Sequence, residues 1–242
     1  VLIFDEVFTG FRLSYGGAQE YFGIQADIVT YGKTLGGGLP IGVVCGRDHL
    51  MKRFKDDHPA NISFARGTFN SHPYVMASMN EFLHRIEQPE IQLIYQQADE
   101  LWNSRVNQLN QLLTEASLPV KIANMHSIWT ILYTHPGRYN WMLQFYLRSE
   151  GLEISWIGTG RIIMSLNYND EDFNEIKTRF ISAASRMQKD GWWWQSPHLN
   201  DKVIKNQMLK EMMLTRFPVL EKFIDKPAAV VEQESTEEVH QQ

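Results

Sequence analysis

The chain has 242 residues, of which 43% are hydrophobic and 21% charged, a composition typical of a globular protein whose core folds without disulfides. Its formal net charge of -5 and its lack of a basic stripe argue against nucleic acid as the main partner. The single cysteine excludes a disulfide framework and fits a reducing, cytoplasmic compartment. No apolar run approaches the length of a membrane span, and the histidines show no metal-ligand spacing, so we expect neither membrane nor metal binding.

The first part of the chain is predicted to alternate strands with turns. An apolar strand over residues 1–4 ends in Asp5-Glu6, and two more strands are expected at 26–31 and 41–45, the last burying Cys45. Residues 13–23 are expected to form a loop rich in glycine and aromatic residues. A strand buried on both faces needs parallel neighbours, so we expect the chain to be the C-terminal part of a longer polypeptide.

Helical spacing begins at residue 73. The pattern predicts a helix over 73–87 and a long amphipathic helix over 89–116. The buried face of the long helix is expected to carry Ile94, Ala98, Leu101, Val106, Leu109 and Leu113. Short strands are expected at 120–125, 128–133, 152–157 and 161–167, with helices at 141–149, 169–187 and 201–216.

These elements divide the chain into four expected parts. Residues 1–88 form the C-terminal part of a larger α/β domain, and residues 89–190 form a small α+β domain. Residues 191–224 form a helical extension, and residues 225–242 form a disordered acidic tail. The run from Trp192 to Trp194 could pack on the body, contact a neighbouring domain or border an apolar substrate, and packing is the interpretation we favour.

The segment TYGKTLGGGLPIG, residues 30–42, places Lys33 between a strand and three glycines. A nucleotide-binding phosphate loop would need a glycine where Asp27 stands, so that alternative is the weaker one. Asp5 also ends a strand, and ligands of parallel sheets bind at the carboxyl ends of the strands. Together, a lysine and a carboxylate suit pyridoxal phosphate, because the lysine forms a Schiff base and the carboxylate pairs with the pyridine nitrogen. The glycines would let the backbone pass close to the planar cofactor.

Three segments, LIFDEVFTGFR, GGAQEYFGIQADIVTYGKTLGGGLPIGVVCG and GTFNSHP, resemble the class III aminotransferases, most of all those of the glutamate-1-semialdehyde 2,1-aminomutase type. The resemblance covers residues 1–187 and implies a fold-type I α/β structure. It implies that Asp5 pairs with the pyridine nitrogen, that Val7 packs on the ring face and that Lys33 carries the cofactor and shuttles a proton. It also implies that Thr68 reaches the cofactor phosphate of a partner subunit, and therefore a homodimer.

On the substrate side, the segment RIIMSLNYNDEDF resembles a family segment whose arginine binds a substrate carboxylate, which would be Arg161. An ordinary strand-end arginine is an equal alternative. The aminomutases do not keep an arginine at this position, so Arg161 favours a transaminase substrate. A resemblance to the aminotransferase domains of polyketide and peptide synthetases leaves open a place in a multidomain biosynthetic polypeptide.

The implied function is the pyridoxal-phosphate-dependent transfer of an amino group between a small-molecule donor and a carbonyl acceptor, by a transaminase or an aminomutase. The alternative is a catalytically incomplete fragment that acts as a dimerisation or interaction module. This alternative stays open because the family's phosphate loop and ring-stacking aromatic residue would precede Val1. Glu6 points away from Asp5 on the strand, and we expect it to support the fold.

Overall fold

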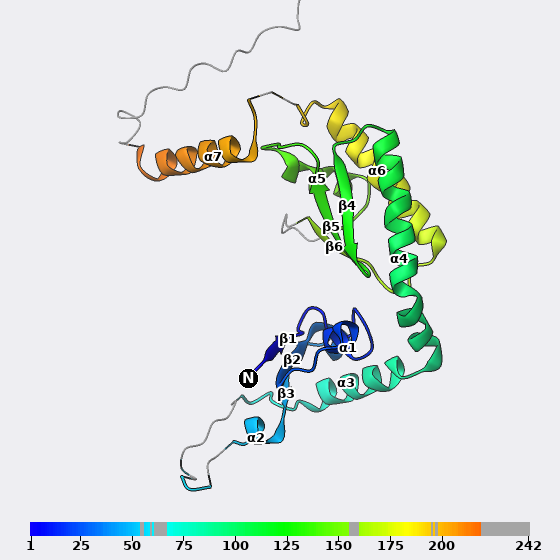
Figure 1. The fold of residues 1–242 in the computed structure, drawn as a ribbon, viewed down its shortest axis with the longest axis vertical. Coiled ribbons are helices and arrows are strands. Elements are labelled where there is room, and N and C mark those ends of the chain that lie inside the picture. Colours follow the sequence, from blue (N-terminus) through cyan, green and yellow to red (C-terminus); the bar gives the residue numbers. More distant parts are fainter. Residues whose placement is uncertain are drawn as a thin grey trace, which may run out of the picture. The chain divides into compact units, whose positions relative to one another are not determined.

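The computed structural model describes residues 1–53, 56–58, 60, 67–154, 160–194, 196 and 198–218. They belong to two compact units. The first consists of residues 1–134 and 140–193, and the second of residues 135–139 and the chain from residue 194 onward. The first unit contains two three-stranded sheets and most of the helices (Figure 1). The mixture of parallel strand pairing and helices confirms the expected α/β class.

The first sheet has the strand order β1–β2–β3. β1 (Ile3–Asp5) pairs in parallel with β2 (Ile28–Gly32), and β2 pairs antiparallel with β3 (Gly42–Gly46). The expectation that β1 is buried is wrong, since it lies at the edge of this sheet and Ile3 is 58% exposed. The expectation that Cys45 is buried is also wrong, because β3 is the other edge strand and Cys45 is exposed.

The segment expected to be a loop over 13–23 contains a short helix, α1 (Gly17–Phe22). It forms because the buried carboxylate of Glu6 accepts hydrogen bonds from the N–H groups of Ala18 and Gln19, at 2.6 and 3.2 Å. These N–H groups lie in the first turn of the helix, where no intrahelical partner exists. The cap comes from a residue distant in sequence, so the local pattern could not predict α1.

Three further helices complete this part of the chain. A 3₁₀ turn, η1 (Lys33–Gly36), follows β2 directly, and α2 (Asp48–Met51) follows β3. The predicted helix from residue 73 is confirmed as α3 (Pro73–Ile86). The hydroxyl of Ser78 on α3 donates a hydrogen bond to the carbonyl oxygen of Gly36 at 2.9 Å, so α3 packs against η1.

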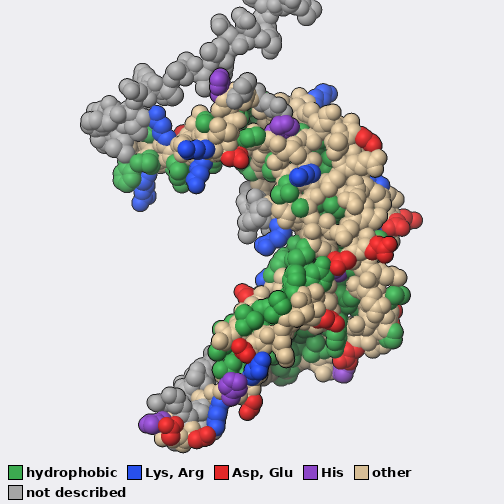
Figure 2. All heavy atoms as spheres, viewed as in Figure 1, with side chains coloured by type: hydrophobic (Ala, Val, Ile, Leu, Met, Phe, Trp, Pro, Cys, Tyr) green, Lys and Arg blue, Asp and Glu red, His purple; other side chains and the backbone are tan. Residues whose placement is uncertain are grey.

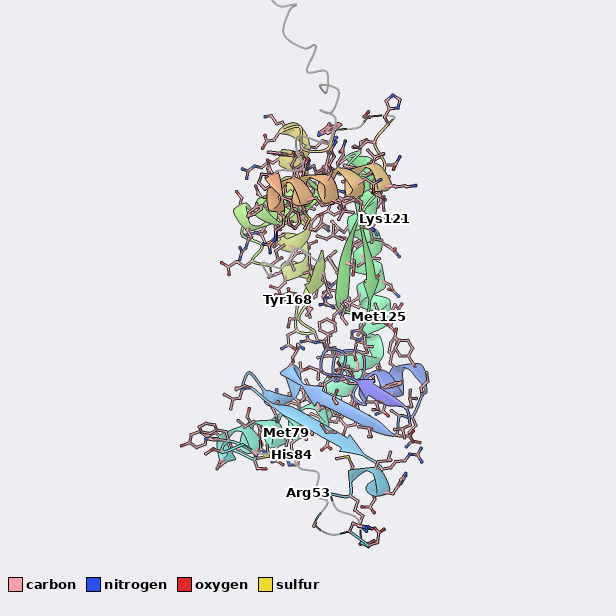
Figure 3. The ribbon with its side chains drawn as sticks, turned by 90° about the vertical axis from the view of Figure 1, so that its left-hand side faces the viewer. Arg53, Met79, His84, Lys121, Met125 and Tyr168 are labelled. Carbon is pink, nitrogen blue, oxygen red and sulfur yellow. The ribbon has the colours of Figure 1, made fainter. Side chains whose placement is uncertain are left out.

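The second sheet is antiparallel, with the order β4–β5–β6. β4 (Val120–Met125) and β5 (Ile128–Tyr133) match the prediction, and Figure 3 labels Lys121 and Met125 on β4. β6 (Arg161–Ile163) is shorter than expected. Of the strand expected at 152–157, residues 152–154 are not a strand and 155–157 lie outside the described residues.

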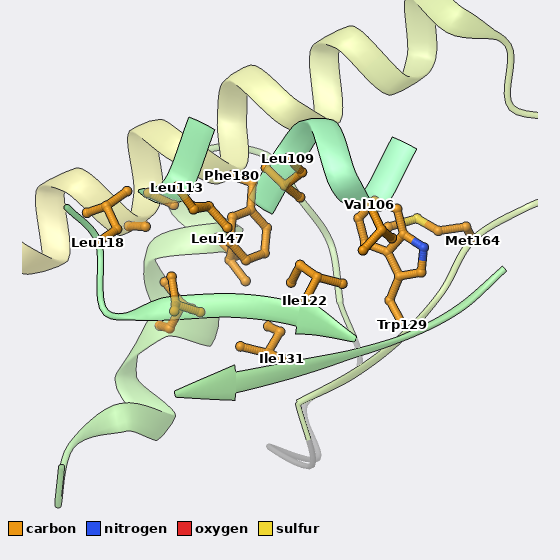
Figure 4. Packing of buried hydrophobic residues seen from close by; sticks show 14 of the residues in the cluster. Val106, Leu109, Leu113, Leu118, Ile122, Trp129, Ile131, Leu147, Met164 and Phe180 are labelled. Carbon is orange, nitrogen blue, oxygen red and sulfur yellow. The ribbon is translucent and has the colours of Figure 1, made fainter. Parts of the chain in front are cut away.

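Four helical elements accompany this sheet: α4 (Pro89–Glu115), η2 (Asn140–Met142), α5 (Leu143–Ser149) and α6 (Asp170–Lys189). Their buried side chains pack with those of β4 and β5 into one apolar core (Figure 4). Trp129 lies edge-on to Trp102 and Phe173, with ring centroids 6.0 and 6.4 Å apart. Leu101, expected in the core, is 37% exposed, because the buried stripe of α4 passes through Ala98, Trp102 and Val106 instead.

Arg105 is a charged residue inside this core and is only 3% exposed. It donates hydrogen bonds to the carbonyl oxygen of Tyr168 and to the carboxylate of Asp170, each at 3.0 Å. Its guanidinium also lies 4.8 Å from the ring centroid of Trp102, which suits a cation–π contact. Arg105 therefore joins α4 to the start of α6, and Figure 3 labels Tyr168 at this turn.

The tryptophan run divides between the two units. Trp192 and Trp193 pack against the apolar core, which confirms the favoured interpretation for these two residues. Trp194 belongs to the second unit and is exposed. The acidic tail expected at 225–242 lies outside the described residues.

In the second unit, α7 (Asp201–Arg216) has the predicted bounds, and Arg138 forms an ion pair with Glu211. Hydrophobic side chains and lysine or arginine side chains lie together on α7 (Figure 2). Met208, Leu209, Met212 and Met213 are among the exposed ones. Within the described residues, no helix is long and apolar enough to cross a membrane.

The core of the first unit predicts a sharp difference between two leucines of α4. Leu113 is fully buried, so Leu113→Ala should lower the free energy of unfolding by about 2–5 kcal/mol. Leu101→Ala removes the same atoms from a partly exposed position and should cost less than about 1 kcal/mol. Urea unfolding followed by circular dichroism measures both values. Equal losses would contradict this assignment of the core.

Candidate active site

Asp5 and Lys33 follow two strands that are directly paired. Asp5 is the last residue of β1 and lies opposite Thr30 of β2, and Lys33 follows the last residue of β2. Because β1 and β2 run in parallel, their carboxyl ends lie at the same edge of the sheet. The structure therefore brings the two predicted residues to the carboxyl ends of neighbouring strands, where ligands of α/β proteins bind.

The carboxylate of Asp5 is oriented by its neighbours. Its Oδ1 atom accepts hydrogen bonds from the Val7 N–H at 3.1 Å and from the Thr30 hydroxyl at 3.2 Å. Among the described residues, no hydrogen bond to Oδ2 occurs. Asp5 is exposed, so one carboxylate oxygen is fixed by the protein and the other can accept a hydrogen bond from a ligand.

Lys33 has an unusual backbone conformation. Its φ angle is 46°, in the left-handed region that residues other than glycine seldom adopt. The side chain is exposed, while Gly32 before it is buried. The turn is held in place by Thr34, whose hydroxyl donates a hydrogen bond to the carbonyl oxygen of Gly10 at 3.2 Å. Strained backbone of this kind clusters at functional sites, so the conformation independently favours a functional role for Lys33.

Two of the glycines around Lys33, Gly32 and Gly37, lie close to other parts of the chain. A Cβ atom at Gly32 would lie 3.1 Å from the carbonyl oxygen of Ile41 and 3.3 Å from Cγ1 of Val7. At Gly37, which has a φ angle of 56°, a Cβ atom would lie 2.6 Å from the hydroxyl oxygen of Ser78. These contacts close the turn after β2 against the chain itself. The expectation that glycines near Lys33 make room for a cofactor stays a prediction.

Glu6 and His72 both stabilise local structure. Glu6 is 1% exposed and caps α1, which confirms the expectation that it supports the fold. His72 precedes α3, and its ring nitrogen Nδ1 accepts a hydrogen bond from the Tyr74 N–H at 3.3 Å. His72 is therefore the N-cap of α3.

Thr68 lies in an exposed turn before α3. The turn is closed by the Asn70 N–H, which donates to the carbonyl oxygen of Gly67 at 3.1 Å. Among the described residues, no hydrogen bond joins the Thr68 side chain to Asp5 or Lys33. Thr68 therefore lies in the turn that precedes α3, the helix that packs on η1.

Arg161 reaches the loop that follows β1. It is the first residue of β6, and its guanidinium carbon lies 4.4 Å from the centroid of the Phe8 ring. Phe8 is three residues beyond Asp5 in the sequence. The second sheet therefore brings Arg161 to the loop that also carries Val7. Sequence reasoning identified Arg161 but missed Phe8, because nothing local indicates which side chain will face an arginine so distant in the chain.

Arg12 is a second cation at the same ring. Its guanidinium carbon lies 5.5 Å from the Phe8 centroid, and its buried Nε has no hydrogen-bond partner among the described residues. Burial lowers the pKa of Arg12 from its usual value, while the neighbouring Tyr95 has the opposite effect. An arginine stays protonated over the whole physiological pH range, so two permanent positive charges lie near the Phe8 ring.

Comparison with known proteins identifies the family of this chain. The family model Aminotransferase class-III matches residues 1–184. The chain belongs to the class III aminotransferase family. It is 40% identical over 134 residues to a glutamate-1-semialdehyde 2,1-aminomutase from Hydrogenobaculum sp., covering 55% of this chain and 30% of that protein. Against the enzyme of the same name from Alkaliphilus oremlandii it is 32% identical over 195 residues, covering 78% of this chain and 45% of that protein.

The solved structures agree with this assignment. A transaminase determined with PLP bound superimposes with a TM-score of 0.66 at 27% identity, covering 79% of this chain and 45% of that one. The fold-type I architecture of the PLP-dependent transaminases is therefore confirmed for this member of the class III family. The chain spans less than half the length of these relatives.

The different roles of the adjacent residues Asp5 and Glu6 lead to a prediction. Glu6→Ala should lower the free energy of unfolding by about 2–3 kcal/mol, because it leaves one buried and one partly buried N–H group of α1 without an acceptor. Asp5→Ala removes an exposed carboxylate and should change stability by less than about 1 kcal/mol. Thermal and urea unfolding measure both variants, and a larger loss for Asp5→Ala would refute the division of roles.

Proposed function

We propose that this chain contributes Lys33, Asp5, Val7, Thr68 and Arg161 to the active site of a pyridoxal-phosphate-dependent class III aminotransferase. The observation that supports this most strongly is the placement of Asp5 and Lys33 at the ends of two paired parallel strands. Lys33 supplies an amine and Asp5 a carboxylate at the carboxyl ends of these strands. This suits pyridoxal phosphate, because its aldehyde reacts with an amine and its pyridine nitrogen pairs with a carboxylate.

The residues present fit the cofactor. When bound, pyridoxal phosphate supplies a ring that accepts electrons while an amino group is exchanged for a carbonyl oxygen. Asp5 has one carboxylate oxygen fixed by Val7 and Thr30, and the other would hold the proton on the pyridine nitrogen. Val7 lies beside Gly32, just before Lys33, and its apolar side chain would exclude water from the ring face. The Lys33 amine would hold the cofactor and move a proton at the substrate Cα atom.

The substrates in this proposal are a small-molecule amino donor and a carbonyl acceptor. A guanidinium presents paired N–H donors that match a carboxylate, so Arg161 suits an amino acid or keto acid. Thr68 lies in an exposed turn, and the proposal gives it a contact with the cofactor phosphate of a partner subunit in a homodimer. We assign the protein to the cytoplasm as part of the same proposal.

Lys33 is the residue that the first experiment should test. Incubation with pyridoxal phosphate followed by borohydride reduction should place a phosphopyridoxyl group on Lys33, and peptide mass spectrometry locates it. Lys33→Ala should abolish this label and leave thermal unfolding within a few degrees of wild type, because the side chain is exposed. Lys52 is an exposed lysine in an ion pair with Asp56 and serves as the internal control. Labelling spread evenly over the lysines would refute the role of Lys33.

The Asp5→Asn variant tests the other half of the pair. An amide cannot hold a proton on the pyridine nitrogen as a carboxylate does, so turnover should fall by about a hundredfold or more. Labelling of Lys33 by borohydride should persist, because the lysine itself is unchanged. Turnover is measured as keto-acid formation under saturating donor. A variant with wild-type turnover would remove Asp5 from the mechanism.

A further inference from the structure

Phe8 is partly buried at the start of the loop that follows Asp5. Its ring packs against the small buried cluster of Leu13, Ala18 and Ile128. Ile128 belongs to β5, so this cluster joins the loop to the second sheet. The backbone near Phe8 is hydrogen-bonded as well, since the Gly10 N–H donates to the carbonyl oxygen of Glu6 at 2.9 Å. The packed ring of Phe8 therefore offers an aromatic face that another side chain can contact.

The guanidinium of Arg161 lies over the Phe8 ring. Its guanidinium carbon lies 4.4 Å from the ring centroid, close enough for a favourable cation–π contact. A guanidinium that lies over an aromatic face keeps its N–H groups in the plane at its edge, where a carboxylate can accept two of them. The aromatic ring thus restricts the rotation of Arg161 without competing for its hydrogen bonds.

Arg12 makes the same place more positive. Two guanidinium carbons lie within 5.5 Å of one ring centroid, and among the described residues the Arg12 side chain has no ion pair or hydrogen bond. Like charges this close repel unless an anion lies near them. The loop that follows Asp5 therefore has two positive charges at the Phe8 ring.

We propose that Phe8 is the positioning residue that holds Arg161 for a substrate carboxylate, and so determines the preference for amino acids over simple amines. This rests on the proposed aminotransferase function. The ligand class is a small amino acid with its carboxylate directed to Arg161 and the charge of Arg12 nearby. Phe8 acts only through Arg161 and touches neither reacting atom.

The test compares two amines that differ only in the carboxylate. 3-Aminobutanoate carries the carboxylate, and 2-aminobutane has a methyl group in its place. Dissociation constants come from titrating the absorbance of the chain loaded with pyridoxal phosphate. Phe8→Leu should raise the dissociation constant of 3-aminobutanoate by about fivefold, because one cation–π contact is lost. The dissociation constant of 2-aminobutane should change by less than about twofold. Phe8→Tyr keeps the ring and should restore the wild-type ratio.

A second readout needs neither cofactor nor turnover. Phenylglyoxal modifies arginine side chains, and peptide mass spectrometry gives the rate at Arg161. Phe8→Leu should raise this rate, because the guanidinium loses its support. The matched control is Phe11→Leu, a phenylalanine of the same loop whose ring packs on Tyr31 and Phe82. It should leave both the Arg161 rate and the ratio of dissociation constants unchanged.

The outcomes separate this inference from the function on which it rests. An unchanged ratio in Phe8→Leu, with Lys33 still labelled by borohydride, overturns the role of Phe8 and leaves the aminotransferase proposal intact. Failure of wild-type protein to label at Lys33 overturns the proposed function instead. If Phe8→Leu does not unfold cooperatively, Phe8→Met, which has a similar volume and no ring, takes its place with the same expected result.

Discussion

Parallel pairing of β1 with β2 determines where the candidate active site lies. In a parallel pair both chains leave the sheet at the same edge, so the residues that follow the strands are neighbours. Asp5 lies opposite Thr30, and Lys33 follows three residues later. An antiparallel pairing of the same strands would place them at opposite ends. The hydroxyl of Thr30 also bonds to Asp5, so the same strand register sets the orientation of its carboxylate.

Two buried charged residues hold the elements around this site in place. Glu6 connects the end of β1 to the start of α1, and Arg105 connects α4 to the start of α6. Glu6 accepts hydrogen bonds from N–H groups that the start of α1 leaves open, and Arg105 donates to the Tyr168 carbonyl oxygen and the Asp170 carboxylate. In both cases hydrogen bonds offset the high cost of burying a charge.

The sequence predicted those elements whose signals are local. Helix α7, the start of α6 and strands β4 and β5 have nearby caps or alternating apolar residues, and their bounds agree with the prediction. The pair Asp5 and Lys33 was also predictable, because both end a strand. Helix α1 and the contact of Arg161 with Phe8 depend on residues far apart in the chain. The burial expected for Ile3 and Cys45 assumed neighbours on both sides of their strands, and both strands lie at edges of the described sheet.

The left-handed backbone conformation of Lys33 lowers the stability of the fold at the residue that the proposed activity uses. A glycine at this position would relieve backbone strain of about 1–2 kcal/mol, and no other part of the turn would have to change. A search for thermostable variants should therefore tend to replace Lys33 and lose the amine on which the proposed chemistry depends. The conformation of this single residue would then mark where natural selection has favoured reactivity over a more stable fold.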